Sequence, residues 1–595
     1  MCMLRYLFYI VLFGISTQTY AQDQKLANDY FRKGDFDKAA HLYGQLYREN
    51  PHNTYYFQHL LKSYQALESY DTVAKLIHKR LKRQKKQGYL WVELGYNYAL
   101  QHQEEQATPY YEKALQILKE HPGSGYQIAK SFRDNHLLDY ALQSYQWMIQ
   151  ALPNANYNYQ LAAIYGEKGE ISQMFDTYLD MATKQGGSLP NIQRFIGKYL
   201  TDDADGENNR LFRKLLIKRL QENPKSEWNK LLSWLYLQQE DYSKAFIQEK
   251  AVFQREQTDL SGIINVGAAA FDKYDYETAQ KAFDYCITHT TDLEKKIYAT
   301  YYLLEAQKKT EKDAQKVDLA YQKAFETYGK TALTTRIQVS YAHFLTFTSN
   351  QPQKAIKILQ EALQNHLNKF QKGEIKIQLG DVLVYTGDYN RALINYSQVQ
   401  LDLKSHALAQ LARFKVAQTS YFRGDFDWAN IQLKVLKKGT ANLISNDAID
   451  LSLLIDDNTA QDSIPTALKK YAVADLLAYQ NKNQAAIDSL QVLLQEFKGH
   501  PIEDEAYYKQ GQLYEKIHQY EPALQDYLSI LSLKDNDILL DDALYKVAQL
   551  YDTYLNNPEK AKEYYKIIIF DHPESIYLVP ARKRYRTLRG DVLVP

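Results

Sequence analysis

The sequence predicts an all-α protein, a solenoid of helical hairpins, and two observations favour this fold class. One skeleton of small and aromatic residues recurs along nearly the whole chain at intervals of about 34 residues, which is typical of stacked repeats. The composition also suits interlocking helix pairs, because 52 Tyr stand against 14 Pro and 24 Gly, and no segment has the pattern of a strand.

The best-preserved copy of the skeleton predicts two antiparallel helices that bury one face against each other. It reads Trp91-x-x-Leu94-Gly95-x-x-Tyr98 and continues with Ala107, Tyr111 and Ala114. We expect Gly95 and Ala107 at the two close approaches of the helices, with Tyr98 and Tyr111 filling the space between them. Neither helix can bury its apolar stripe alone, so each pair depends on its neighbours.

The same positions can be followed along the chain. In order they are Ala27, Tyr30, Ala39 and Tyr43 around the turn Gly34-Asp35-Phe36; Ala129, Phe132, Ala141 and Tyr145; Gly267, Ala279, Phe283 and Cys286; Gly380, Ala392 and Tyr396 around Gly387-Asp388-Tyr389; Ala417 and Ala429 around Gly424-Asp425-Phe426; Gly511, Tyr514, Ala523 and Tyr527; and Ala548, Tyr551, Ala561 and Tyr565. Because Cys286 falls where the repeat needs a small apolar residue, we expect its thiol to be buried and unreactive.

This skeleton resembles the tetratricopeptide repeat family, whose signature is an aromatic, a Leu-Gly pair and a Tyr, then Ala and an aromatic in a second helix. The resemblance covers most of the chain and implies a superhelix, in which the first helix of each pair lines a concave groove that binds peptides or partner helices. By this resemblance the groove candidates are Phe31, Arg32, Tyr89, Tyr96, Tyr126, Arg133, Phe414 and Tyr421. For each aromatic the alternative is packing against the next repeat.

The repeats are expected in two blocks. Residues 22–438 form an N-terminal array with degenerate units, and residues 466–577 form a C-terminal block with cleaner ones. Between them, 439–465 contains a helix-like apolar stripe at Ala448–Asn458 that fits no repeat register, and the segment is predicted to be an irregular insertion or linker. The basic segment 578–595 is predicted to cap the solenoid, whose end needs a polar outer face, with docking of an acidic partner as the alternative.

A second basic run closes the second helix pair. Cations favour the carboxyl end of a helix, so we interpret this run as a solvated helix end. It consists of Lys79, Arg80, Lys82, Arg83, Lys85 and Lys86.

Residues 1–21 have the pattern of a secretory signal peptide. Arg5 supplies a short positive region, an apolar stretch follows, and Thr19-Tyr20-Ala21 forms a small-x-small cleavage site. We expect cleavage after Ala21 and a periplasmic location, with an uncleaved anchor as the alternative. The apolar stretch is well short of the roughly 20 residues that span a membrane, so no transmembrane segment is predicted.

The sequence argues against several function classes. A formal net charge of +1 is not that of a general nucleic-acid binder. The 14 His are scattered, without a zinc-binding pattern, so no metal site is predicted. Gly329-Lys330-Thr331 ends like a phosphate-binding loop, but Ala324 stands where that motif needs a Gly. We therefore predict no catalytic residues, no cofactor and no enzyme activity.

The leading hypothesis is an exported, non-enzymatic protein-binding scaffold in the periplasm of a double-membrane bacterium. The C-terminal block looks most like the periplasmic repeat proteins of outer-membrane assembly and Tol-type systems, which implies an envelope assembly or secretion complex. Its partners would be one or more proteins, bound as a peptide or helix in the concave groove, and peripheral association with a membrane complex is compatible with this role. The alternative is a catalytic or carbohydrate-processing accessory with its site in the 439–465 insertion.

Overall fold

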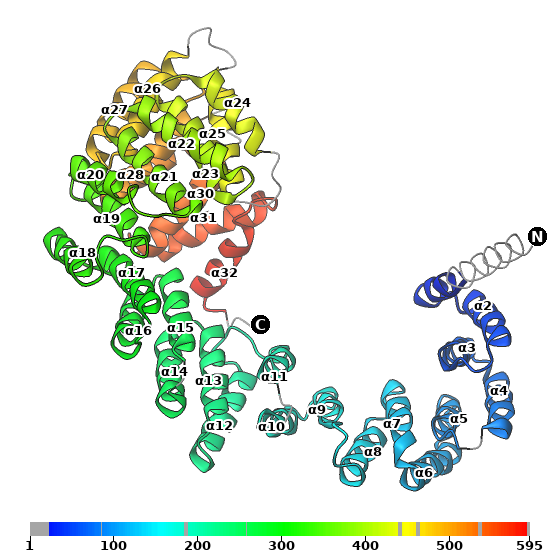
Figure 1. Ribbon diagram of the computed structural model, residues 1–595. Coiled ribbons are helices and arrows are strands. Elements are labelled where there is room, and N and C mark those ends of the chain that lie inside the picture. Colours follow the sequence, from blue (N-terminus) through cyan, green and yellow to red (C-terminus); the bar gives the residue numbers. More distant parts are fainter. Residues whose placement is uncertain are drawn as a thin grey trace, which may run out of the picture. The chain divides into compact units, whose positions relative to one another are not determined.

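The computed structural model describes residues 23–84, 86–183, 188–257, 259–437, 443–459, 465–533 and 538–591. Within these ranges every regular element is a helix, and consecutive helices pack as pairs, which confirms the predicted all-α solenoid of helical hairpins (Figure 1). The predicted signal peptide, 1–21, lies outside the described residues. The chain divides into two compact units, unit 1 (Met1–Asp241) and unit 2 (Tyr242–Pro595), which we describe separately.

Unit 1 begins with a helical segment at residues 23–32. Its further helices are α2 (Phe36–Glu49), α3 (Thr54–Ala66), α4 (Tyr70–Arg83), α5 (Tyr89–Ala99), α6 (Glu104–Glu120), α7 (Gly125–Asp134), α8 (Leu138–Ala151), α9 (Asn158–Glu167), α10 (Ile171–Ala182), α11 (Leu189–Ile196), α12 (Glu207–Glu222) and α13 (Ser226–Gln238), with the 3-10 turn η1 (Pro122–Ser124) before α7.

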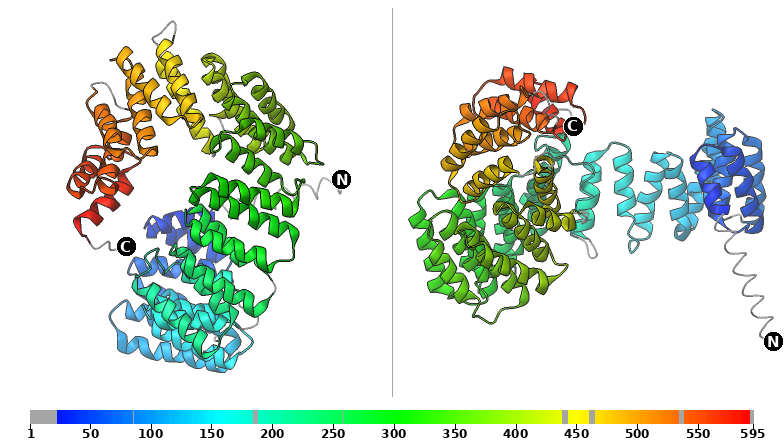
Figure 2. Two further views of the ribbon diagram at one scale, coloured as in Figure 1. Left: turned by 90° about the vertical axis from the view of Figure 1, so that its left-hand side faces the viewer. Right: turned by 90° about the horizontal axis from the view of Figure 1, so that it is seen from above.

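Unit 2 continues the pairs, which Figure 2 shows from two further directions. Its helices are α14 (Tyr242–Glu256), α15 (Ser261–Asp272), α16 (Tyr276–His289), α17 (Leu293–Thr310), α18 (Ala314–Tyr328), α19 (Thr335–Phe347), α20 (Pro352–Ala362), α21 (Lys369–Tyr385), α22 (Tyr389–Leu403), α23 (Ala407–Phe422), α24 (Phe426–Leu436), α25 (Leu443–Thr459), α26 (Thr466–Tyr479), α27 (Asn483–Glu496), α28 (Glu503–Lys516), α29 (Tyr520–Leu531), α30 (Leu540–Thr553), α31 (Pro558–Asp571) and α32 (Leu578–Arg589).

The two helices of a pair cross where a glycine of the first faces a tyrosine of the second. A Cβ atom on Gly95 would lie 2.5 Å from Cε1 of Tyr111, and one on Gly511 would lie 2.8 Å from Cε1 of Tyr527. Gly380 faces Tyr396 in the same way. These contacts confirm the predicted register, because a side chain larger than hydrogen has no room at the crossing.

The second-helix tyrosines also bond back to the first helix. The Tyr396 hydroxyl donates to Oδ1 of Asp381 at 2.7 Å, and the Tyr565 hydroxyl donates to Oδ2 of Asp552 at 3.2 Å. Both rings are buried. In these two pairs the bond satisfies the only polar atom of the buried ring. The hydroxyl of Tyr111 differs, because it is buried without a hydrogen-bond partner among the described residues.

In most pairs the turn between the two helices contains one residue in the left-handed region, although the turn between α17 and α18 has none. The first four of these residues in unit 1 are Gly34, Glu68, His102 and His136, which follow one another at intervals of 34 positions, and Gly169 follows after 33. In unit 2 the interval is longer, since Gly387 and Gly424 are separated by 37 positions and so are Asn481 and His518. The spacing between successive left-handed residues therefore gives the repeat length, including in repeats whose turn lacks a glycine.

The segment 439–465 differs from the expected irregular linker, because residues 443–459 form the helix α25. Ala448 and Ile455 of this helix are buried, and the Ser452 hydroxyl donates to Oδ1 of Asn430 on α24 at 2.9 Å. The first helices α23 and α26 also pack directly on each other, so the stacking continues past α25. Residues 443–459 are thus an inserted helix inside a continuous array, and the division of the chain falls at Asp241 instead.

The turn after α26 ties that helix to earlier first helices. Nε2 of Gln480 donates to the carbonyl of Tyr385 at 2.9 Å, and Nδ2 of Asn481 donates to the carbonyl of Phe347 at 2.8 Å. Phe347 and Tyr385 are the last residues of α19 and α21, where carbonyls lack helical partners. These bonds hold α19, α21 and α26 together as one body.

The last described helix, α32, packs on α31 at the end of the array. Arg584 binds Asp552 through two bonds of 2.8 Å, one from Nε and one from Nη2. Ala581 is buried against the preceding pair, while most other side chains of α32 face solvent. A polar outer face on the terminal helix is what the end of a solenoid needs.

Candidate partner-binding groove

The first helices of unit 2 form a continuous face that carries charged residues in partly buried positions. We call the surface of α15, α17, α19, α21, α23, α26 and α28 the first-helix face. On it, Nζ of Lys308 lies 2.7 Å from Oε1 of Glu305, and Nζ of Lys415 lies 3.1 Å from Oδ1 of Asp381. Each ion pair fixes the position of its two side chains. The first-helix face is therefore polar at these positions, and it also carries two pockets.

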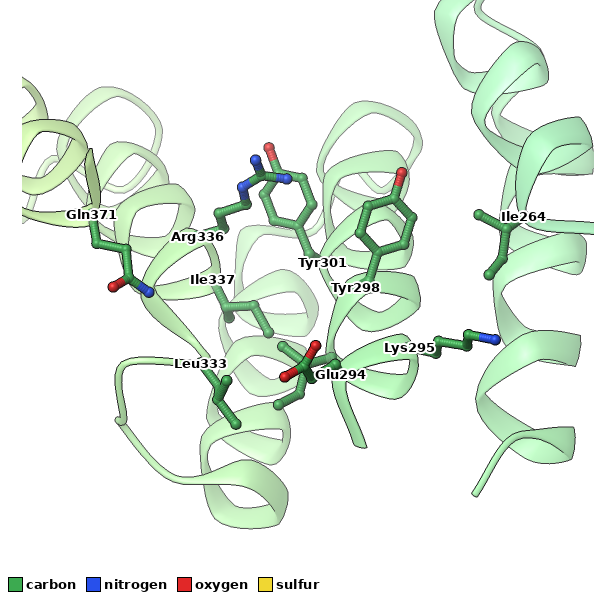
Figure 3. Close-up of a pocket in the computed structure, with 10 residues that line it drawn as sticks. Ile264, Glu294, Lys295, Tyr298, Tyr301, Leu333, Arg336, Ile337 and Gln371 are labelled. Atoms are coloured by element: carbon green, nitrogen blue, oxygen red, sulfur yellow. The ribbon is translucent and has the colours of Figure 1, made fainter. Parts of the chain in front are cut away.

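The first pocket opens on α15, α17, α19 and α21 and has a volume of about 450 Å³. Its lining comprises Ile264, Glu294, Lys295, Ile297, Tyr298, Tyr301, Leu333, Arg336, Ile337 and Gln371. Figure 3 shows the Arg336 guanidinium and the hydroxyls of Tyr298 and Tyr301 toward one end, with Leu333 and Glu294 toward the other. The pocket therefore has a cation and two phenols at one end, and an apolar side chain beside a carboxylate at the other.

Of the two cations that line this pocket, Arg336 is the one that could pair with a ligand. It forms no ion pair with any described residue, whereas Nζ of Lys295 lies 3.4 Å from Oδ1 of Asp259. Burial raises the pKa of Tyr298 and of Tyr301 to about 12, against a small opposing effect of Arg336, so both phenols stay neutral donors. Leu333 is 50% exposed at the rim and offers an apolar contact.

The second pocket lies between α23, α25, α26 and α28 and has a volume of about 460 Å³. Its lining comprises Phe414, Gln418, Asp447, Asp450, Leu451, Leu454, Tyr471, Asp475, Glu505, Tyr508, Lys509, Gln512 and Leu539. Four of these side chains are carboxylates and one is a cation. We call this site the acidic pocket.

The carboxylates of the acidic pocket are incompletely neutralised. Nζ of Lys509 lies 2.5 Å from Oδ1 of Asp475, which accounts for the one cation. Burial, then the hydrogen bond and charge of the neighbouring Asp504, raise the pKa of Glu505 to about 9. Burial and then the charge of Asp447 raise the pKa of Asp450. Within the described residues Oε2 of Glu505 has no hydrogen-bond partner, so the pocket holds an acceptor without a donor.

The structure places one of the predicted groove residues, Phe414, in the acidic pocket. Two other predictions were wrong, because Tyr89 is 1% exposed and Tyr421 is fully buried. The Tyr421 ring lies 5.9 Å from the ring of Phe426, inside its own helix pair, and Tyr89 packs in a core cluster with Phe57. Both rings face neighbouring helices rather than a groove.

The other five predicted groove residues lie on three first helices of unit 1. Arg32 is exposed, Phe31 packs edge-on against His59 with ring centroids 5.3 Å apart, and Tyr96 is partly buried. Tyr126 is 41% exposed and stacks on Tyr157.

Arg133 is already engaged, since its Nε donates to Oε1 of Glu167 at 2.9 Å. Of the five, Arg32 and Tyr126 are the most exposed, so their side chains are accessible to a partner. Cys286 is buried as predicted, and burial raises the pKa of its thiol to about 12.

The charged residues of the two pockets were not predicted. Asp447 and Asp450 lie in the segment that fits no repeat register, and that misfit was the one available signal for them. Asp475, Glu505 and Arg336 stand at ordinary first-helix positions, where a charge usually marks solvent.

No described helix is both long and apolar enough to cross a membrane. The described ranges contain no group of three or more His, Cys, Asp or Glu side chains placed to hold a metal ion.

The tetratricopeptide repeat family matches residues 542–575. This segment begins within α30 and ends after α31, so it spans one helical pair. No curated protein sequence matches the chain.

The solved structures that are similar to the chain include the following three. Yeast Tom70 has 14% sequence identity and a TM-score of 0.29, over 96% of this chain and 99% of that one. A tetratricopeptide repeat protein from Parabacteroides merdae has 15% identity and a TM-score of 0.25, over 48% of this chain and 98% of that one. The complex of Naa15 and Naa10 bound to HypK-THB has 11% identity and a TM-score of 0.27, over 97% of this chain and 95% of that one.

Proposed function

We propose that this protein is a non-enzymatic scaffold that binds other proteins, and that unit 2 holds a partner segment with a Lys or Arg side chain in the acidic pocket. A helical repeat solenoid of tetratricopeptide type suggests protein–protein interaction in general. The observation that carries the finer proposal is the pocket of Asp447, Asp450, Asp475 and Glu505, which Lys509 alone opposes.

A cationic side chain from a partner would offset the excess of carboxylates in this pocket. Carboxylates that lie close together repel each other, so an added cation is favoured here. Burial, together with the hydrogen bond and charge of the adjacent Asp504, already raises the pKa of Glu505. A guanidinium or ammonium group would favour the ionised form and supply donors to Oε2 of Glu505. Phe414, Leu451 and Leu454 line the same pocket and would pack against the aliphatic part of the partner.

The test uses a photo-crosslinkable residue at Gln418, which lines the pocket. Asp447→Asn combined with Asp450→Asn should lower the yield of the crosslinked partner about tenfold, the scale of one lost charge-assisted contact. The matched control is Asp427→Asn with Asp457→Asn, which removes two exposed carboxylates from α24 and α25 outside the pocket. Equal yields from the two double variants would count against the acidic pocket as the binding site.

We also propose that the chain is exported to the periplasm of a double-membrane bacterium and supports an envelope assembly or secretion complex. The support is the pattern of Arg5, the apolar stretch and Thr19-Tyr20-Ala21 in the sequence. Intact-mass analysis of the protein from its native cells is expected to give a mature chain that begins at Gln22. A mass that still includes residues 1–21 would contradict cleavage.

A further inference from the structure

Unit 1 contains a pocket of its own, distinct from the two pockets of unit 2 described above. It lies between the carboxyl end of α2, the turn that follows it, α3 and α4, and has a volume of about 540 Å³. Pockets of about 300–1,000 Å³ are the size that small organic ligands occupy. Its lining comprises Gly44, Tyr47, Arg48, Pro51, His52, Leu60, Tyr64, Thr72, Leu76, Lys79, Arg80, Arg83 and Gln84. We call it the basic pocket.

The charged side chains that line the basic pocket are all cationic. Arg48, Lys79, Arg80 and Arg83 all line it, and among the described residues no Asp or Glu does. The whole chain is nearly neutral, with a formal net charge of +1. Four cations around one small cavity are therefore a local feature of this site and not the reflection of a basic protein.

Arg80 is the residue that a solvated helix end does not explain. Its side chain is 5% exposed, so the sequence-based interpretation of this run as solvated is wrong for Arg80. Nε donates to Oε1 of Gln84 at 3.2 Å, but Nη1 is buried and has no hydrogen-bond partner among the described residues. A buried guanidinium with a free donor is strongly disfavoured unless an anion pairs with it.

Aromatic contacts compensate this charge only in part. The Arg80 guanidinium carbon lies 4.4 Å from the ring centroid of Phe57 and 5.7 Å from that of Tyr47. Such cation–π contacts are weaker than the cost of removing an unpaired charge from water. The carboxyl end of α4 favours cations in its last turn as well, but its backbone supplies no acceptor to Nη1.

We propose that the basic pocket binds an oxyanion, a phosphate or carboxylate group, carried on a small organic body. The planar fork of Arg80 suits two oxygens of one such group, while Lys79 and Arg83 add charge at the rim. Tyr47, Tyr64, Leu60 and Leu76 form an apolar wall on which the organic body packs. This site lies in a different unit from the acidic pocket and takes a ligand of the opposite charge.

The direct test is calorimetric titration of the full chain with phenyl phosphate, benzoate, inorganic phosphate and phenyltrimethylammonium. We expect one of the two aryl anions to bind at a single site, with inorganic phosphate weaker because it lacks the organic body, and no binding of the cation. The comparison of phenyl phosphate with benzoate decides between phosphate and carboxylate as the group recognised. Absence of binding by all three anions would overturn the proposal.

A pair of double variants tests the location. Lys79→Gln with Arg83→Gln removes two charges from the lining and should weaken aryl anion binding about tenfold or more. Lys82→Gln with Lys86→Gln removes two exposed charges from the same segment outside the lining, and should change the affinity less than about twofold. An equal loss in the two variants would show attraction to a diffuse basic surface and would exclude the pocket.

Arg80→Met tests the buried guanidinium itself. This variant keeps the apolar stem and removes the unpaired charge, so it should melt no lower than the parent chain without ligand and should lose the shift in melting temperature caused by the aryl anion. Unchanged ligand response in a folded Arg80→Met variant would contradict the role of Arg80. If Arg80→Met does not fold, the two double variants still decide the question, because their changes are at exposed positions.

Discussion

Gly95 and Gly44 are both helical glycines, yet they have different surroundings. A Cβ on Gly95 would lie 2.5 Å from Tyr111, whereas one on Gly44 would lie 3.8 Å from Cδ1 of Leu60 at ordinary contact distance. We expect Gly95→Ala to destabilise unit 1 by about 1 to 3 kcal/mol through overpacking. Gly44→Ala should instead be neutral or stabilise by up to roughly 1 kcal/mol, because alanine favours the helix.

Thermal and urea unfolding of the two glycine variants check this prediction. They are matched in chemistry, since each adds one methyl group to a helix of unit 1. A Gly95→Ala variant as stable as the Gly44→Ala variant would mean that Tyr111 moves aside freely and that the crossing is not close-packed.

Some residues could be predicted individually and others could not, and the difference is physical. Gly95, Tyr111 and Cys286 sit at positions whose size the repeat constrains, so the repeat pattern was sufficient. Tyr89 and Tyr421 stand on first helices, where a ring can face either the groove or the next helix at the same sequence spacing. Their burial depends on how neighbouring pairs are rotated, which the periodicity of one helix does not contain.

At the scale of the element, the turn inside many of the pairs contains one left-handed residue. Gly387 has a φ of 80°, and a Cβ there would meet no atom within 4 Å. Gly387→Ala should therefore destabilise unit 2 by roughly 1 to 2 kcal/mol through backbone conformation alone. Gly123→Ala is the control, since a Cβ at Gly123 also meets nothing within 4 Å and no positive φ is required.

Urea denaturation of the Gly387 and Gly123 variants gives the comparison. The Gly123 variant should stay within about 0.5 kcal/mol of the parent chain. A Gly387 variant that behaves like it would show that the turn adapts to a right-handed residue without loss.

The inserted helix α25 marks the limit of prediction for elements. Its apolar stripe was visible in the sequence, but the repeat register predicted no partner for it. Gly424 and Asn481, the turn residues on either side of α25, are 57 positions apart, against 37 for the adjoining intervals. The extra length is a helix that contacts α23, α24 and α26, which becomes evident only once α23 is seen to pack on α26.

At the scale of the molecule, the division at Asp241 and Tyr242 makes a prediction about fragments. A fragment of residues 242–595 should keep its helicity and melt cooperatively. Fragments 242–438 and 466–595 should each melt at a lower temperature, because the cut separates α23 from α26 and breaks the bonds from Gln480 and Asn481 to α21 and α19. Circular dichroism melts of the three fragments provide the measurement.

A 466–595 fragment that melts at the temperature of 242–595 would favour the boundary expected from the sequence. The architecture itself was predictable, since one skeleton recurs through the chain and its packing is local. The acidic pocket was not, because its lining comes from four helices between Phe414 and Leu539 and no single segment carries its pattern.

The buried tyrosines of the second helices have a consequence for behaviour in alkali. Burial is the first cause that raises the pKa of each of them above its ordinary value, and the set includes Tyr43, Tyr111, Tyr145, Tyr396, Tyr527 and Tyr565. In the unfolded chain a phenol ionises near pH 10, so above that pH the unfolded state releases protons that the folded state retains. Each such ring therefore makes the free energy of unfolding fall more steeply as the pH rises. Phenolate formation and unfolding should occur together. Because phenols fill its helix crossings, the fold is expected to unfold cooperatively in alkali as these phenols ionise.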